Sequence, residues 1–167
     1  MNRIISFLIR LIISAALVYY LYAIVEVRVY RAVGTSMDST IYNGELLLSI
    51  KPNKIKKGDI IIFNTEGSPS IKRIIGLPKE KIEIKSDGKI YIEDKLLKEN
   101  YISTKSSKGE IVYPHIVEDN SYFVLGDNRI DSYDSRFIKV KDINKNQIRG
   151  KIIFSISKFK LINRNID

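Results

Sequence analysis

The chain has 167 residues, which is enough for one domain with a real hydrophobic core and too few for two large ones. Its 28 Lys and Arg against 19 Asp and Glu give a formal charge of +9, so its surface is expected to attract anionic partners such as nucleic acid or acidic lipid headgroups. It has no cysteine, which excludes disulfides, thiol catalysis and cysteine-based metal sites.

An apolar run, IISFLIRLIISAALVYYLYAIV, extends from Ile4 to Val25 near the start of the chain. It has about the length needed to cross a hydrocarbon core and its only charge is Arg10, so it predicts a membrane-spanning helix. A cleavable signal peptide is one alternative, but the run exceeds the usual apolar region and no small-x-small site follows it directly. A buried core helix is another, but there is little polar face to meet water.

The charges around this run predict its orientation. Arg10 lies close enough to the N-terminal end to reach the headgroups beside Arg3, and the tyrosines near the other end suit the opposite interface. Arg28 and Arg31 follow the run closely and weaken this asymmetry. We therefore expect residues 1–26 to anchor the chain in the cell membrane with a cytoplasmic N-terminus, and residues 27–167 to form an extracytoplasmic domain.

Beyond the anchor the pattern changes from helical to strand-like. Residues 27–33 alternate apolar and polar side chains, and short β-rich runs follow between turn residues: ELLLSI, DIIIFN, IKRIIGL, SYFVLGDN and IRGKIIFSI. Asp87-Gly88 joins two further runs and predicts a hairpin, because Gly tolerates the positive φ of a tight turn. Residues from about 94 to 119 are polar and irregular. The fold class is therefore mainly β, with antiparallel sheet.

The stretch GTSMDST, residues 34–40, offers hydroxyl groups that could act as nucleophiles if a base were near. The usual base is His, but the single one, His115, is expected to be a solvent-exposed loop residue. A lone His also makes a metal site improbable. The remaining base is a lysine that burial keeps neutral.

Lys72 is the lysine that stands at an apolar position. Strand alternation places it on the same face as Ile74 and points Arg73 the other way. An edge strand often carries an inward lysine to prevent aggregation, so this context alone does not establish catalysis.

The boxes GTSMDST, GDIIIFN, IKRIIGLPKEKIEI and VLGDNRIDSYDSR resemble, in order and spacing, those of the bacterial type I signal peptidases, from about Tyr30 to Ile156. The resemblance implies Ser36 as nucleophile, Lys72 as general base, and Ser132 as the serine that hydrogen-bonds the lysine amine. Arg73 and four residues of the last box are expected to brace the site through ion pairs: Asp127, Arg129, Asp134 and Arg136. With this assignment the two reacting atoms should lie roughly 2.6 to 3.2 Å apart.

The resemblance also implies a membrane-bound serine endopeptidase that removes signal peptides from exported preproteins, with no cofactor and no metal. The implied partners are those signal peptides and the lipid membrane, with secretion or pilus assembly machinery as further candidates, and no nucleic acid. The alternative function is a specialised signal peptidase-like protein for pilus assembly with little or no hydrolysis. Two other classes fit less well. Self-cleaving repressor-type proteins have no spanning helix, and a basic β domain without chemistry leaves the spacing of the boxes unexplained.

Three departures from the family pattern bear on activity. Ser39 stands where the family usually has Pro, and Lys79-Glu80 stands where it has Gly-Asp. The excursion over residues 94–119 is short, as in the compact Gram-positive enzymes with a reduced cap region. Some members use a hydroxyl two positions before the nucleophile as a second oxyanion donor, but Gly34 occupies that position here. Met37 is expected to pack under the site against a membrane-facing apolar surface.

Overall fold

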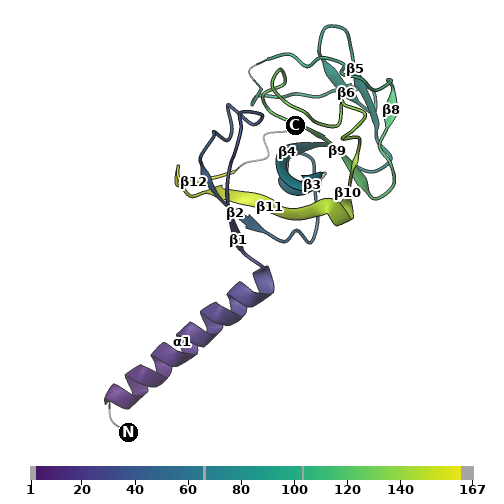
Figure 1. The fold of residues 1–167 in the computed structure, drawn as a ribbon. Helices are drawn as coiled ribbons and strands as arrows, with labels where there is room; N and C mark the ends of the chain where they lie inside the picture. The colour runs from purple at the N-terminus through teal and green to yellow at the C-terminus, as the bar shows by residue number, and fades with distance from the viewer. Residues whose placement is uncertain (1–2, 66, 103, 163–167) are drawn as a thin grey trace.

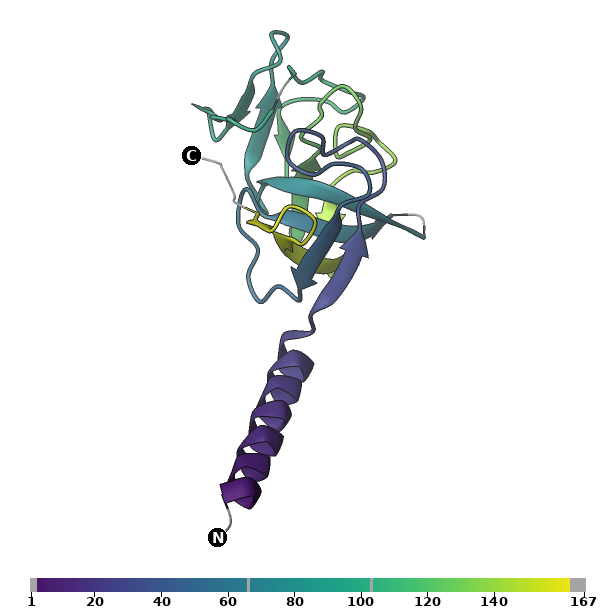
Figure 2. The same ribbon diagram turned by 90° about the vertical axis from the view of Figure 1, so that its left-hand side faces the viewer.

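The computed structural model describes residues 3–65, 67–102 and 104–162. Helix α1 (Arg3–Val25) projects as a rod from a β-rich body, and the turned view shows the same separation (Figures 1 and 2). Within the described residues it is the one helix long and apolar enough to cross a membrane, with a mean hydropathy of 1.7 over Arg3–Tyr20. No part of that window is buried, so the buried core helix considered above is excluded.

The body contains a larger antiparallel sheet with the strand order β1-β2-β11-β3-β4-β9-β10, in which β12 also pairs with β11. Its strands are β1 (Arg28–Arg31), β2 (Leu46–Ile50), β3 (Ile60–Thr65), β4 (Ser68–Gly76), β9 (Ser121–Leu125), β10 (Ile143–Asn144), β11 (Ile148–Ser155) and β12 (Lys160–Leu161). The turn η1 (Lys145–Gln147) precedes β11. Strand β1 lies at one edge of this sheet, and β4 lies in its interior between β3 and β9.

A smaller antiparallel sheet has the order β7-β6-β5-β8. It consists of β5 (Lys81–Ile84), β6 (Ile90–Ile92), β7 (Lys95–Leu96) and β8 (His115–Ile116). Its strands β5, β6 and β8 are labelled in Figure 1. The hairpin predicted at Asp87-Gly88 is confirmed: β5 and β6 pair antiparallel, and Gly88 has a φ of +82°.

Alternation along the strands of the larger sheet gives each face its own core. In β3, Ile60 and Ile62 pack in a cluster with Met37 and Leu47, whereas Ile61 and Phe63 pack in the cluster on the other face. A third cluster joins β9 and Ile75 to the smaller sheet. Because apolar side chains cover both faces of the second half of β4, a polar side chain there is buried whichever way it points, and residues 72–76 are all buried. This placement buries Lys72, and it excludes the reading of Lys72 as a protective edge lysine.

Candidate active site

The residues before and after Ser36 form a tight turn over a hydrophobic floor. The Asp38 N–H donates to the Thr35 carbonyl at 3.0 Å, and the Thr40 N–H donates to the Met37 carbonyl at 3.1 Å. The Met37 side chain packs beneath this turn, as expected, and is buried in the interior cluster. Its packing fixes the turn from below and leaves Ser36 half-buried above it.

Strand β4 brings Lys72 to this turn. Lys72 Nζ lies 2.7 Å from Ser36 Oγ, within the predicted distance. The lysine is 5% exposed, and burial lowers its pKa from 10.5 to about 8, against the opposing effect of the Asp134 carboxylate. About a tenth to a fifth of the amine is therefore neutral between about pH 7 and 7.4, and the neutral form is the one that can accept a hydroxyl proton.

Ser132 lies at the same site but has a different hydrogen-bond partner from the one expected. Its hydroxyl donates to Asp134 Oδ2 at 2.7 Å, and no bond to Lys72 occurs within the described parts of the chain. The Asp134 carboxylate is close enough to accept this hydrogen bond because it lies two residues further along the same loop. Ser132 therefore reaches Lys72 indirectly, through the carboxylate whose charge raises the pKa of the amine.

The peptide at Gly126 runs between the segments of both serines. A Cβ atom at this position would lie 2.2 Å from Ser132 Oγ and 2.4 Å from the Ser36 carbonyl oxygen. Both distances are far below van der Waals contact, so only glycine allows the three segments to meet.

Three buried arginines hold the loops around the site. Arg73 forms a bidentate pair with Asp127, at 2.8 and 2.6 Å, and its guanidinium lies 4.0 Å from the centre of the Tyr101 ring. Such fork-shaped pairs are rigid as well as strong. Arg73 was expected to pair within the last box, and the structure gives it Asp127 as partner, which ties β4 to the loop after β9.

Arg136 and Arg129 complete this network of ion pairs and hydrogen bonds. Arg136 binds both oxygens of Asp134, at 2.8 and 2.9 Å, and also donates to the carbonyl of Arg129 at 2.9 Å. Arg129 donates to the carboxylate of Glu99 and, at 2.7 Å, to Ser106 Oγ. Glu99 and Ser106 come from the irregular segment after β7, and no sequence pattern singled them out.

Asn128 is a further residue at the site that sequence reasoning missed. Its side-chain amide donates to the Thr35 carbonyl at 3.2 Å, and its backbone N–H donates to the Ser36 carbonyl at 3.1 Å. The Thr35 carbonyl and the Ser36 N–H belong to one planar peptide, so holding the carbonyl fixes the opposite direction of the N–H. Thr35 Oγ1 in turn donates to Asp131. Asn128 lies within the box VLGDNRIDSYDSR, and this position was the sequence signal that could have identified it as a site residue.

Gly34 contributes no side-chain donor, and its own N–H donates to Asn43 Oδ1 at 3.0 Å. Its φ of +92° is one that glycine adopts without strain. The hydroxyl donor that some family members have at this position is thus replaced by a backbone turn.

A cavity of about 150 Å3 opens beside the Ser36–Lys72 pair. Its walls come from the end of β1, the turn at Ser36, β3 and the start of β4. The apolar side chains among them are Tyr30, Ala32, Val33, Met37, Ile41, Ile62, Pro69 and Ile71. A cavity of this volume is filled by about one benzene-sized group. It can therefore admit small apolar side chains and exclude large ones.

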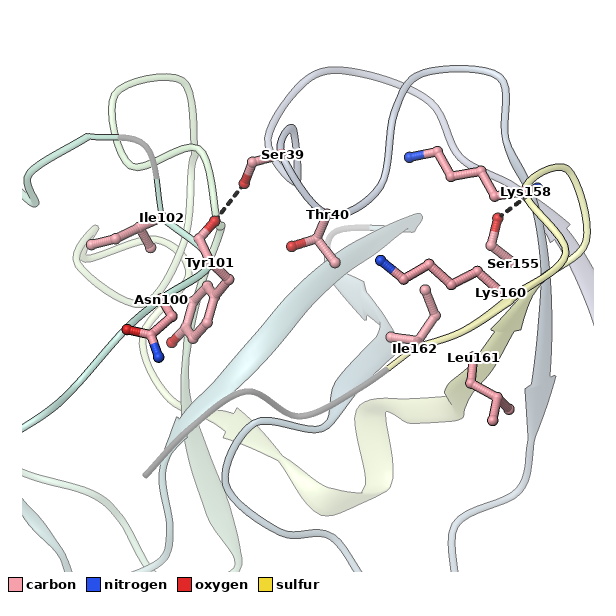
Figure 3. A pocket seen from close by; sticks show the side chains of 10 residues that line it. All are labelled: Ser39, Thr40, Asn100, Tyr101, Ile102, Ser155, Lys158, Lys160, Leu161 and Ile162. Carbon is pink, nitrogen blue, oxygen red and sulfur yellow. Dashed lines mark hydrogen bonds between the residues drawn. The ribbon is translucent and has the colours of Figure 1, made fainter.

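A larger cavity of about 350 Å3 lies on another side of the turn and contains neither Ser36 nor Lys72 (Figure 3). Ser39 Oγ donates across its rim to the Tyr101 carbonyl at 2.5 Å. Ser39 has a φ of +85°, which the proline ring cannot adopt. Ser39, in place of the family's Pro, therefore adopts a backbone conformation that Pro could not adopt, and its hydroxyl contacts the segment after β7.

His115 takes no part in the Ser36–Lys72 pair. It lies half-buried in β8 with Nε2 3.0 Å from the Asp142 carboxylate, so the expectation of an exposed loop histidine is wrong. Its contacts hold the smaller sheet against the segment before β10.

The sequence and the fold are similar to those of known proteins. A family model described as "Signal peptidase, peptidase S26" matches residues 5–157. A signal peptidase I of Bacillus licheniformis is 37% identical over 64% of this chain and 64% of its own length, so the alignment spans less than two thirds of that relative. Signal peptidase IB of Staphylococcus aureus strain Mu50 is 29% identical over 93% of both chains.

A crystal structure of a signal peptidase I from Enterococcus faecalis V583 is also similar, with a TM-score of 0.50 and 30% identity. The match covers 60% of this chain and 98% of that one. This similarity and the observed sheets confirm the predicted antiparallel β fold. The family model covers most of the sequence, and the chain therefore belongs to the signal peptidase family of peptidases.

Proposed function

We propose that this chain is a membrane-bound serine endopeptidase that removes N-terminal signal peptides from exported preproteins. One observation carries the proposal most directly: Ser36 Oγ and the buried amine of Lys72 are 2.7 Å apart. Family membership and the small apolar cavity beside the pair support the same substrate class.

The substrate would bind as an extended strand along β1. Strand β1 lies at the sheet edge, so its free backbone groups are available to another strand. The cavity beside Ser36 would take the small side chains before the cut. This arrangement brings the scissile carbonyl over Ser36 Oγ.

In the first step, Ser36 Oγ attacks the scissile carbonyl carbon while neutral Lys72 takes the hydroxyl proton. The Ser36 N–H, held in direction by Asn128, donates to the developing oxyanion. The carbon–nitrogen bond then breaks, and the departing amine takes the proton from Lys72. An acyl-enzyme on Ser36 remains.

In the second step, Lys72 takes a proton from a water molecule that attacks the ester. The ester bond breaks, Ser36 Oγ recovers its proton from Lys72, and the signal peptide is released. Asp127, Asp134 and their arginine partners would act as positioning residues, because they hold the two loops together without lining the path of the proton.

We further propose that α1 crosses the membrane with its N-terminus in the cytoplasm and the β body outside. Arg3 and Arg10 near the start of the helix support this orientation. Tethering would hold the site at the surface where signal peptides emerge.

The test is coexpression of the full chain with a preprotein that carries an Ala-x-Ala cleavage site, comparing wild type with Ser36→Ala and Lys72→Met. We expect mature product from the wild type alone. Equal processing by all three proteins, above a verified background, would refute the assignment of the pair.

A further inference from the structure

Two cavities meet at Ser36 and Lys72. The small apolar cavity described above lies on one side, and a cleft of about 520 Å3 lies on the other. Both are lined by Gly34, Ser36, Ser70 and Lys72, so the reacting pair stands at their junction. The cleft continues between β3 and the loop after β9, and its further lining residues are Thr35, Phe63, Thr65, Ile130, Asp131, Ser132, Tyr133 and Val140. We call the whole of this cleft the leaving-group cleft.

The direction of the substrate follows from this junction, given the proposed function. A peptide cut at Ser36 has its acyl part on one side of the nucleophile and its amine part on the other. The residues of β1 line the small cavity, which would take the acyl part. The amine part, which is the beginning of the mature protein, must therefore leave through the second cleft.

The charge of the leaving-group cleft differs from that of the whole molecule. The chain carries a formal charge of +9, yet Asp131 and Lys72 are the acidic and basic side chains that line this cleft within the described residues. When Lys72 is neutral and ready to act as a base, Asp131 gives the cleft a net negative charge. One Asp131 oxygen accepts from Thr35, which holds the carboxylate at the cleft wall.

The cleft also offers apolar surface next to that charge. Ile130 is 79% exposed and Tyr133 is 53% exposed on the same loop as Asp131. The stem of a lysine or arginine side chain can pack on such surface while its charged end reaches a carboxylate. The same wall repels an acidic side chain.

We propose that the leaving-group cleft binds the first residues of the mature protein, and that Asp131 selects basic over acidic side chains there. This inference rests on the proposed endopeptidase function and adds a specificity on the other side of the cut. Exposed charge pairs are weak, so the expected preference in kcat/KM is about threefold to tenfold between Lys and Asp, and it should shrink as salt is added.

The experiment uses the full chain in detergent micelles and a set of preproteins with identical residues before the cut. Each of the first three residues after the cut is changed in turn to Lys, Ala or Asp, and kcat/KM is measured at low salt. We expect Lys to exceed Ala and Ala to exceed Asp at one or more of these positions. The informative quantity is the ratio of kcat/KM for the Lys substrate to kcat/KM for the Asp substrate. Asp131→Asn should bring this ratio to about one, and Asp131→Lys should reverse the preference.

The ratio is the informative quantity because it separates charge selection from positioning. Asp131→Asn keeps an oxygen that can accept from Thr35, and any general change at Ser36 or Lys72 alters all substrates alike. Asp119→Asn is the matched control, since it removes an exposed carboxylate that pairs with Lys79 away from the cleft. This variant should keep the wild-type ratio.

An equal ratio in the wild type and Asp131→Asn would overturn the inference while leaving the endopeptidase function intact. A loss of ratio in Asp119→Asn as well would also overturn it, because the selection would then belong to the overall charge. If no preprotein is cut by the wild type, the proposed function itself fails and takes this inference with it.

Discussion

Lys72 can accept a proton only while its amine is neutral, so its pKa governs the pH dependence of the reaction. Burial lowers this pKa to about 8, and the neutral fraction therefore grows as the pH rises through that value. We expect kcat/KM to increase about tenfold per pH unit well below pH 8 and to level off above it. The measurement is preprotein cleavage from about pH 6 to about pH 10.

Asp134 provides a check on this assignment, because its charge raises the pKa of Lys72. Asp134→Asn should shift the rise in kcat/KM to lower pH while reducing the plateau, since the pair with Arg136 is also weakened. A profile that stays at the wild-type position in a folded Asp134→Asn protein would contradict control of the reaction by Lys72.

Asn128 positions the peptide whose N–H faces the proposed oxyanion. Asn128→Ala should remove the bond to the Thr35 carbonyl and lower kcat by roughly tenfold or more, with a smaller effect on KM, because the affected donor acts in the transition state. Asn146→Ala, an exposed change in η1, is the control and should leave both constants unaltered. A rise in KM without loss of kcat in Asn128→Ala would contradict the positioning role.

At the scale of elements, the turn between β4 and β5 shows how a departure from the family pattern affects stability. Lys79, which stands in place of the family's Gly, has a φ of +72° and a largely exposed side chain. A side chain in this conformation costs roughly 1 to 2 kcal/mol, and the greater freedom of unfolded Gly offsets part of that cost.

We therefore expect Lys79→Gly to raise the free energy of unfolding by about 0.5 to 1 kcal/mol, measured by urea denaturation. Lys98→Gly is the control, because Lys98 is exposed but is not among the residues with positive φ. That change should destabilise the fold. If both variants lose stability equally, the strain assigned to Lys79 is absent.

Sequence alone predicted most of the strands but not their partners. Alternation showed which side chains share a face, and Asp87-Gly88 specified one hairpin, yet the pairing of β11 with both β2 and β3 joins segments far apart in the chain. The same limit applied to the site, where residues within recognisable boxes were found and long-range partners were not. The boxes located Ser36 and Lys72, whereas Glu99 could not be found because its contact with Arg129 depends on how an irregular segment crosses the body. Ser132 was located, but its hydroxyl donates to the Asp134 carboxylate instead of bonding to Lys72.

At the scale of the whole molecule, α1 projects from a body that carries the site, so membrane topology decides which compartment the site faces (Figure 2). With the proposed orientation, protease added to right-side-out membrane vesicles should degrade the β body and leave a short N-terminal fragment. Inside-out vesicles should protect the body. Detergent should remove that protection, and the opposite pattern would reverse the orientation.

Gly126 has a consequence for other sequences with this fold. Adding one methyl group there would drive the segments of Ser36 and Ser132 apart while adding nothing to the apolar clusters of the two sheets. A related chain could therefore keep its nucleophile, its lysine and its fold, and still have lost hydrolysis through this position. When genomes are searched for family members that have lost hydrolysis, the residue aligned with Gly126 is as informative as the residue aligned with Ser36.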